Sequence, residues 1–411
     1  MNEIQLIEST FLNIYNWSYF PVIFISFLFY FVLFFGIVYR KRIKYPKLDY
    51  YPFVSIHIPV YNDPIVKKCI EACLNLDYPK DKYEIIVADD SDDEKTRKII
   101  DEYKDKVRII RRNNREGFKA GALNNALKYS KGEIIVVFDS DSIPPKNFLK
   151  RVIPFFKDEK VALVQTKQVY WNKNMNIVSK FASTLQSIYY NFLVKLDSYL
   201  NLTFCAGSSV AIRREILEKY KWNEESVTED ADLSLKIFID GYKTIYLDNV
   251  KTKSEVPFNL FHFLKQQARW TFGITRAFLD NFIDLLSSKN LNFIQKIYLT
   301  LRFSISFISI FILTFTFSGT ILMLLGEPKP FTFDDFISFS TTFILTSGYL
   351  LLFFISAKME KIKLRNIAVP IFLGIINLIN NLFFSFKAIY SRKFYWYKTP
   401  KLGNLIFEKE K

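Results

Sequence analysis

The chain has 411 residues, a length that allows two or three domains. Half of the residues are hydrophobic and 18% are aromatic, more than a soluble globular protein usually carries, yet 24% are charged. This mixture argues against a wholly soluble enzyme and predicts a soluble domain joined to membrane segments.

The net charge of +15 would also suit a protein that binds nucleic acid. The basic residues, however, gather beside apolar runs, at 40–44 and at 358–365, which favours a membrane surface over nucleic acid as the partner. The three cysteines, Cys69, Cys73 and Cys205, lack the company of other metal ligands. They are expected to be reduced thiols in a cytoplasmic domain.

The first long apolar stretch, residues 20–39, contains no charge and is long enough to cross a hydrocarbon core of ~30 Å as a helix. The basic cluster at 40–44 follows it directly. Because cytoplasmic flanks of membrane helices are rich in lysine and arginine, the next domain is expected in the cytoplasm and the amino terminus outside. A cleaved signal peptide fits less well, since the cluster lies on the wrong side of the apolar stretch.

From Tyr50 onward, short β-rich runs alternate with amphipathic helical segments. Strict alternation predicts a doubly wound parallel sheet, which binds ligands at the carboxyl ends of its strands. The expected strands are 53–60, 84–88, 107–111, 134–138 and 162–169, and the expected helices are 63–76, 95–103, 119–129 and 181–200.

Charged side chains follow the expected strands at this edge. Asp139 and Asp141 come directly after the strand 134–138, and a spacing of two on extended chain directs both carboxylates to the same side. Two hard oxygen ligands suit a divalent cation that also holds a phosphate, although a solvated Asp-Ser-Asp turn is the alternative. With Arg115 or Lys119 to neutralise phosphate oxygens, the cleft would suit a nucleoside diphosphate. No P-loop and no Gly-x-Gly-x-x-Gly motif supports an ATPase or a dinucleotide-binding enzyme.

Two further acidic stretches each allow two interpretations. The run 89–93 either binds a ligand or supplies the acidic first turn that the helix macrodipole favours. Thr228 can cap a helix whose first turn holds Glu229 and Asp230 as ionised carboxylates. Asp230 is therefore the candidate general base, whereas capping alone would explain the same three residues.

The segment 258–282 is too polar to span a membrane and too apolar for a solvated helix, so it is expected to lie along the membrane surface. Within it, Arg269 could clamp a phosphate and Trp270 could offer a flat face to a sugar ring. An ordinary interfacial pair of Trp and Arg would look the same in sequence.

Three long apolar runs follow, at 298–325, 336–356 and 367–386. The mostly acidic loop between the first two is expected outside and the basic loop 358–365 inside. A third crossing would place the basic tail 392–401 outside, which the same rule disfavours. One run is therefore expected not to span fully, and the last, with its proline, glycine and asparagines, is the best candidate to be broken or buried against protein.

Five motifs occur in one order along the chain: Asp89-Asp90, residues 119–124, Asp139-Ser140-Asp141, Thr228-Glu229-Asp230 and Gln266-x-x-Arg269-Trp270. In this order, over about 52–273, the chain resembles the membrane-bound glycosyltransferases of family 2, which include cellulose, hyaluronan, chitin and mannan synthases. Residues 396–401 also resemble the ending of that group. The resemblance implies an α/β GT-A (Rossmann-like) catalytic domain with transmembrane helices and amphipathic interface helices. It also implies an inverting displacement and a nucleotide sugar held with Mg²⁺ or Mn²⁺.

The resemblance implies a role for each matching residue. Asp230 would be the catalytic base, with Glu229 and Thr228 beside it. The nucleotide and diphosphate would contact Tyr61, Asp89, Asp90, Lys119, Asp139 and Arg269. The metal ion would bind Asp139 and Asp141. The acceptor would contact Phe204, Cys205, Gln266 and Trp270.

The expected organisation is a multi-pass protein of the cell membrane. It comprises an amino-terminal anchor (1–45), a cytoplasmic catalytic domain (46–254), interface helices (255–297), a carboxy-terminal transmembrane region (298–390) and a basic cytoplasmic tail (391–411).

The expected activity is the transfer of a hexose from a UDP- or GDP-sugar to a growing β-glycan, processive and coupled to translocation through the membrane. The alternative is the transfer of one sugar to a membrane lipid, as in the similar glucosylceramide synthases. A catalytically silent membrane scaffold is a third possibility, but it would tolerate loss of the acidic motifs, which are all present.

Overall fold

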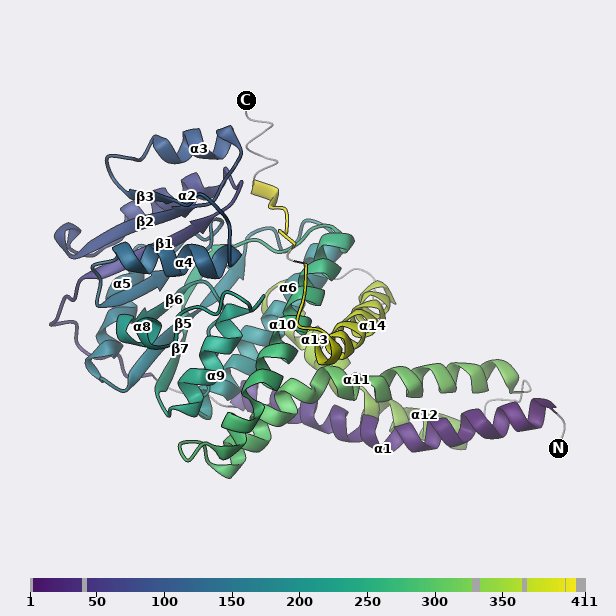
Figure 1. Cartoon of the computed structure of the whole chain (residues 1–411). Helices are drawn as coiled ribbons and strands as arrows, with labels where there is room; N and C mark the ends of the chain where they lie inside the picture. The colour runs from purple at the N-terminus through teal and green to yellow at the C-terminus, as the bar shows by residue number, and fades with distance from the viewer. Residues whose placement is uncertain (1–2, 39–42, 327–332, 364–367, 396, 404–411) are drawn as a thin grey trace.

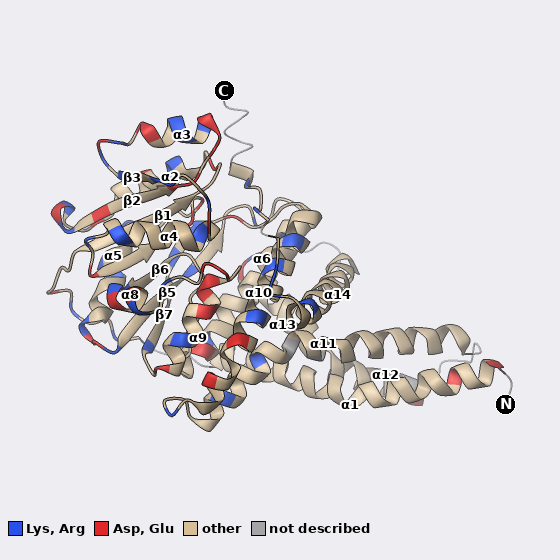
Figure 2. Cartoon of the chain, viewed as in Figure 1, with Lys and Arg blue, Asp and Glu red and all other residues tan. Residues whose placement is uncertain are grey.

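The computed structural model describes residues 3–38, 43–326, 333–363, 368–395 and 397–403. An α/β domain forms one end of the molecule, and two long helices, α1 (Glu3–Val38) and α11 (Phe293–Leu325), extend away from it side by side (Figure 1). Charged residues are frequent on the α/β domain and rare on the far parts of these helices (Figure 2). The division that the composition predicts is therefore present.

The first half of the domain alternates strands and helices, as predicted. Its strands β1 to β4 pair in parallel in the order β3-β2-β1-β4, and β4 is buried along its whole length, as expected for an inner parallel strand. The elements are β1 (Val54–Val60), α2 (Val66–Leu74), η1 (Lys80–Lys82), β2 (Tyr83–Asp89), α3 (Glu94–Asp101), β3 (Arg108–Arg111), α4 (Phe118–Tyr129) and β4 (Ile134–Val137).

Beyond β4 the sheet is mixed, so the prediction of a wholly parallel sheet is wrong for its second half. β6 (Val210–Arg213) runs antiparallel to β4, with Val136 opposite Ala211. β6 is also antiparallel to β5 (Val161–Tyr170), which is parallel to the last strand, β7 (Lys243–Ser254). Strand direction was not predictable here, because a fully buried strand has the same apolar pattern in either direction.

The single helix predicted at 181–200 is interrupted. α6 (Ile177–Ile188) leads into a π-helical turn, η3 (Tyr189–Leu193), and then into α7 (Val194–Tyr199). A π-helical turn holds one residue more than an α-helical turn and leaves the apolar periodicity of the segment almost unchanged, so the sequence did not reveal it. The other elements of this half are α5 (Phe148–Val152), η2 (Ile153–Lys157), α8 (Arg214–Tyr220) and α9 (Glu229–Ile239).

The predicted amphipathic segment forms α10 (Leu260–Ser287), which packs against α9 on one side and α14 (Ala368–Tyr390) on the other. Both ends of α10 are tied to the α/β domain. Asn259 caps its start, and Ser288 just after its end donates a hydrogen bond to the Ile239 carbonyl at 2.7 Å. The helix therefore lies along the domain, and its place at the membrane surface stays a prediction.

Within the part of the chain that the structure describes, two helices are long and apolar enough to cross a membrane, α1 and the 369–390 portion of α14. Two bent pairs raise the number to at most four: the two parts of α11, and α12 (Phe333–Thr346) with α13 (Gly348–Met359), which meet at 66°. The basic residues 40–42, the loop residues 327–332 and 364–367, and residue 396 of the predicted carboxy-terminal motif lie outside the described residues.

The breaks do not fall where the sequence predicts them. The last apolar run was expected to be broken or buried against protein. It forms one continuous helix, α14, whereas the second run breaks near Ser347 and the two parts of α11 meet at 47°. At that break Gly348 lies so close to α1 that a Cβ would stand 2.2 Å from the Ser26 carbonyl oxygen. α14 packs along α10, where Asn380 donates to the Leu264 carbonyl, but only 22% of its apolar window is buried, so the expected burial against protein is partial.

Candidate active site

Lys119 of α4 connects two of the predicted motifs. Its ammonium group lies 2.7 Å from the Asp139 carboxylate and 3.8 Å from that of Glu229, and it donates to the Gly207 carbonyl at 2.9 Å. Burial disfavours the charge, but Asp139, Glu229 and Asp230 raise the pKa of Lys119 above its ordinary value. A fixed positive charge therefore stands between the loop after β4 and the start of α9, where it can neutralise an anion.

Gly207 brings the backbone before β6 against Asp230. Its φ of +70° is a conformation that side chains with a Cβ rarely adopt. A Cβ at this position would lie 2.8 Å from Asp230 Oδ2 and 3.4 Å from Lys119 Nζ. Glycine is therefore required by both the turn and the close approach.

Asp230 begins α9 in a partly buried position. Burial and the neighbouring Glu229 raise the pKa of Asp230 to about 7, against the opposing charges of Lys119 and Arg269. A carboxylate with a pKa near neutrality can take a proton and release it again, which is what a general base requires.

The motif that contains Arg269 lies directly on the motif that contains Asp230. Arg269 Nη1 donates to the Val227 carbonyl at 3.0 Å. One turn later, a Cβ on Gly273 would stand 2.5 Å from Thr228, so the α10 backbone packs closely on this residue. The two motifs, distant in sequence, share one interface.

Thr228 occupies the N-cap position of α9, but its side chain makes no capping hydrogen bond, so this part of the prediction is wrong. Its buried Oγ1 has no hydrogen-bond partner among the described residues. The contact with Gly273 explains the difference, since Thr228 packs against α10. Helix capping therefore does not account for the Thr-Glu-Asp sequence.

Asp141 is buried on the other side of the loop after β4. Its Oδ2 accepts hydrogen bonds from the Ser254 hydroxyl at 2.8 Å and the Glu255 N–H at 3.1 Å, and its Oδ1 lies 3.0 Å from the Lys401 ammonium group. Burial acts to raise the pKa of Asp141, but Lys401 and these hydrogen bonds outweigh it and hold that pKa below its ordinary value. Asp141 is therefore ionised and paired with a cation from the far end of the chain.

Lys401 belongs to a segment that returns to the domain, residues 397–403, called here the C-terminal strap. Lys398 of the strap lies 2.9 Å from the Asp63 carboxylate. The Leu402 and Gly403 N–H groups donate to the Glu255 carboxylate at 2.6 and 2.9 Å. Sequence reasoning placed these lysines in a tail and missed their contacts, although their resemblance to the ending of a known group was a signal.

The residues predicted to bind the nucleotide are held by arginines. Asp89 accepts from Arg111 at 2.7 Å, and both carboxylate oxygens of Asp90 accept from Arg112, at 2.9 and 2.5 Å. The Arg115 guanidinium, expected at the phosphates, lies 3.2 Å from the centre of the Tyr61 ring. These residues stand at the carboxyl ends of β1 to β3, but a nucleotide base would have to share them with the arginines.

The predicted acceptor residues divide into two groups. Phe204 and Cys205 are buried, and Phe204 packs edge-on against Phe238 at 4.9 Å between ring centres. Gln266 and Trp270 are partly exposed and lie four residues apart on one face of α10. Phe204 and Cys205 thus belong to the core beneath the site, whereas Gln266 and Trp270 are able to contact another molecule.

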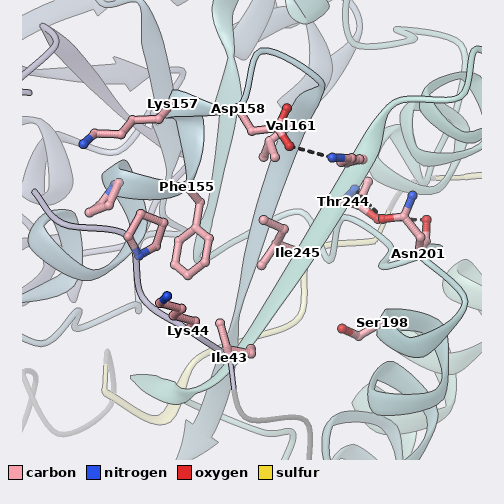
Figure 3. A pocket seen from close by; sticks show the side chains of 13 residues that line it. Ile43, Lys44, Phe155, Lys157, Asp158, Val161, Ser198, Asn201, Thr244 and Ile245 are labelled. Atoms are coloured by element: carbon pink, nitrogen blue, oxygen red, sulfur yellow. Dashed lines mark hydrogen bonds and ion pairs between the residues drawn. The ribbon is translucent and has the colours of Figure 1, made fainter.

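A cavity of about 550 Å³ lies at the opposite end of the sheet, by the amino ends of β5 and β7 (Figure 3). Lys44, Phe155 and Ile245 are among the side chains that line it. None of the predicted site residues does so, and this cavity is separate from the acidic cluster.

Asp139 and Asp141 provide two carboxylates, and no group of three or more metal-ligating side chains gathers within the described ranges. This donor set fits Mg²⁺ or Mn²⁺, which proteins often hold through one or two carboxylates together with substrate phosphates. The ammonium groups of Lys119 and Lys401 on these carboxylates mark a place where positive charge is favoured.

Two family models match the chain. The family model Glycosyl transferase family 2 matches residues 55–221, and the family model Cellulose synthase matches residues 212–372. Together they cover both the acidic cluster and the helices that pack on it.

Curated relatives include two proteins of Oryza sativa subsp. japonica. Probable glucomannan 4-beta-mannosyltransferase 7 is 30% identical over 62% of this chain and 46% of its own length, and Probable glucomannan 4-beta-mannosyltransferase 6 is 31% identical over 68% and 51%. The chain thus spans about half the length of the curated relatives it matches.

Among solved structures, the mannosyltransferase PcManGT from Pyrobaculum calidifontis, determined in complex with GDP-Man and Mn²⁺, aligns with a TM-score of 0.60. It is 20% identical, and the alignment covers 86% of this chain and 98% of that structure. At this identity the likeness concerns the fold alone, and it supports the expected GT-A fold.

Proposed function

We propose that the chain, which matches the family models Glycosyl transferase family 2 and Cellulose synthase, is a glycosyltransferase that moves a hexose from a nucleotide-diphosphate sugar to a growing β-glycan. The observation that carries the proposal is the placement of Lys119 between Asp139 and Glu229, with Asp230 beside it. A cationic group for the diphosphate and a titratable carboxylate for the acceptor thus lie within one cluster. Since the relatives are named as mannosyltransferases and the neighbouring structure holds GDP-Man, GDP-mannose is the first donor to test.

On the donor side, Lys119 and Arg269 would bind and neutralise the diphosphate as it leaves. Asp139 and Asp141 would hold a divalent cation, which supplies further charge neutralisation at the phosphate oxygens when bound. Lys398 and Lys401 of the C-terminal strap add two positive groups on the same side.

On the acceptor side, Asp230 would accept the proton of the attacking hydroxyl. Its raised pKa suits this task near neutral pH, and Lys119 and Arg269 keep enough positive charge nearby for the ionised form to exist. Trp270 and Gln266, on the partly exposed face of α10, would hold the acceptor sugar.

We further propose that α1, α11 and the pair α12 and α13 cross the membrane, whereas α14 lies along its surface on the catalytic side. The loop before α14 contacts the domain, where the Lys363 N–H donates to Asn174. The segment after α14 contacts it too, through the ion pair of Arg392 with Asp280 of α10. A helix with both ends on the same domain and α10 along its length has not crossed a bilayer of ~30 Å.

Single-cysteine labelling tests this topology, because the three native cysteines are buried. Lys363→Cys and Lys393→Cys should react with a membrane-impermeant maleimide from the side that carries the catalytic domain, which we place in the cytoplasm. Gly326→Cys, at the far end of α11, should react from the opposite side. Reaction of residues 363 and 393 from opposite sides would make α14 a true crossing.

A donor screen tests the activity. The purified protein is incubated with Mn²⁺ and each of several UDP- and GDP-sugars, and released nucleotide diphosphate is measured. Turnover by the wild type and its loss in Asp230→Asn, which keeps the shape of the side chain, would support the proposal. Equal inactivity of both proteins toward every donor would overturn it and favour a catalytically silent scaffold.

The radiolabelled product separates two versions of the activity. A ladder or a product of high mass would indicate processive synthesis. We favour this outcome because membrane helices pack on the site. Translocation of the glycan would then be measured in vesicles. A single glycolipid would indicate transfer to a lipid acceptor. The exposed apolar side chains of α10 and α14, such as Ile283 and Phe383, keep this second version open, since lipid would lie beside the site.

A further inference from the structure

The loop between α7 and β6, residues 200–209, connects the first turns of α11 with the catalytic base. It is called the acceptor-side loop here because it carries Phe204, Cys205 and Gly207. One end of the loop contacts α7, α11 and Thr244 of β7, and the other end contacts Asp230, Lys119 and Gln165 of β5. A loop with these two attachments can carry a displacement of a membrane helix to the site.

The attachment to α11 is a buried ionic cluster. Asp197 of α7 is fully buried, and its two carboxylate oxygens are engaged by the Tyr298 hydroxyl at 2.5 Å and by Arg302 Nη2 at 3.1 Å. Gln295, one turn before Tyr298, donates to the Leu200 carbonyl at 2.8 Å. α11 therefore holds both α7 and the first residue of the loop.

Arg302 also touches the loop itself. Its guanidinium carbon lies 5.1 Å from the centre of the Phe204 ring, and Phe303 of the same helix packs against Phe204 at 5.8 Å. The Asp197 carbonyl accepts from the Leu202 N–H at 2.8 Å. The ion pair, the α7 backbone and the loop thus form one unit.

The attachment to the base runs through Ser234 and Gly207. The Cys205 N–H donates to the Ser234 hydroxyl at 2.9 Å, and that hydroxyl donates to the Asp230 carbonyl at 2.6 Å. Gly207 then lies against the Asp230 carboxylate and accepts from Lys119. A shift of the loop would therefore move the groups that surround the base.

We propose that Arg302 and Asp197 are positioning residues that tie membrane helix α11 to the acceptor-side loop and thereby place the acceptor against Asp230. This inference rests on the proposed glycosyl transfer. Removing one partner of a buried charge pair leaves the other charge uncompensated. Loss of either Arg302 or Asp197 should therefore disrupt the contact between α11 and the loop. Asp141 is held by Ser254 and Glu255, outside the acceptor-side loop, whereas the Asp139 N–H donates to the Ser208 hydroxyl at the β6 end of the loop.

The test compares wild type, Arg302→Gln, Arg302→Lys and Asp197→Asn in detergent or vesicles. Two products are measured with the donor that the screen identifies: sugar transferred to any acceptor, and free sugar released by hydrolysis. In Arg302→Gln and Asp197→Asn we expect the ratio of transfer to hydrolysis to fall at least about tenfold while the donor KM changes less than about twofold. Arg302→Lys, which keeps the charge but loses the planar group over Phe204, should fall between.

Lys296→Gln is the matched control, because Lys296 lies on the same helix and donates to the Leu286 carbonyl, away from the loop. Its ratio should equal that of the wild type. Equal losses of transfer and hydrolysis in the Arg302 and Asp197 variants, or an unchanged ratio in all of them, would overturn the inference. A wild type that turns over no donor would instead overturn the proposed function.

Hydrogen exchange of the acceptor-side loop gives a readout that does not need activity. In Arg302→Gln the amides of Leu202 to Ala206 should exchange faster, whereas those of β4 should not change. If Arg302→Gln fails to fold, hydrogen exchange of Arg302→Lys and Asp197→Asn tests the same contact between α11 and the loop. Unchanged exchange across the loop in all folded variants would contradict the tie.

Discussion

The ammonium group of Lys401 lies 3.0 Å from the carboxylate of Asp141, although Asp141 follows β4 in the middle of the α/β domain and Lys401 lies in the C-terminal strap, beyond α14. The C-terminal strap therefore completes the charge balance of the acidic cluster. Because Lys401 occupies the carboxylate that we expect to bind a divalent cation, the strap and the cation compete for Asp141.

Lys401→Gln is therefore expected to bind Mn²⁺ about tenfold more tightly than the wild type when no donor is present, because Asp141 loses its internal counter-ion. Calorimetric titration of the donor-free protein with Mn²⁺ measures this. Lys398→Gln is the control, since its ammonium group pairs with Asp63 and should give a smaller change. Equal Mn²⁺ affinity in wild type and both variants would mean that Asp141 is not a metal ligand.

The pH dependence of transfer should report Asp230. Its pKa of about 7 lies above the ordinary value, so the carboxyl is protonated below that pH and available as a base above it. The value of kcat/KM should rise as the pH increases through about 7 and then level off. A profile flat between pH 5.5 and 8.5 (roughly 1.5 units on either side of that pKa) would exclude Asp230 as the base.

Glu229→Gln should move this profile. Glu229 is one of the charges that raise the pKa of Asp230, so its removal should shift the midpoint to lower pH. Glu218→Gln, an exposed residue paired with Arg214, is the control and should leave the midpoint in place. A shift of the Glu229→Gln midpoint to higher pH would contradict the assigned electrostatics.

Gly207→Ala should reduce both stability and transfer. The left-handed backbone costs roughly 1–2 kcal/mol for a residue with a Cβ, and that Cβ would press on the Asp230 carboxylate. Transfer should fall by about 10- to 100-fold, as expected for a misplaced catalytic group. Gly374→Ala is the control, since no heavy atom stands within 4 Å of the added carbon. Similar activities of the two variants would show that the close contact is unimportant.

Thr228→Val should leave thermal stability almost unchanged, because the buried hydroxyl has no hydrogen-bond partner among the described residues and valine has the same shape. Asn259→Ala is the matched comparison. The Asn259 side chain does accept N–H groups at the start of α10, and its loss should cost about 1 kcal/mol. A larger loss for Thr228→Val than for Asn259→Ala, by thermal denaturation, would restore the capping role.

The sequence by itself determined the first four strands, the helices between them and the amphipathic α10, because their apolar periodicities are local and strong. It also predicted that Lys119, Asp139 and Asp230 lie where strands end or helices begin, which they do. The tertiary structure alone decided the antiparallel direction of β6, since a buried strand looks the same in either direction.

Tertiary packing also decided which polar residues meet. The capping interpretation of Thr228 followed a correct local rule, but the contact with Gly273 of α10 overrode it. The ion pair of Lys401 with Asp141 depends on the path of the chain through several helices. The sequence around a lysine in a basic tail does not indicate which carboxylate it will pair with. Local pattern thus specified the elements and their reactive ends, whereas long-range contacts, which leave no periodicity in the sequence, specified their partners.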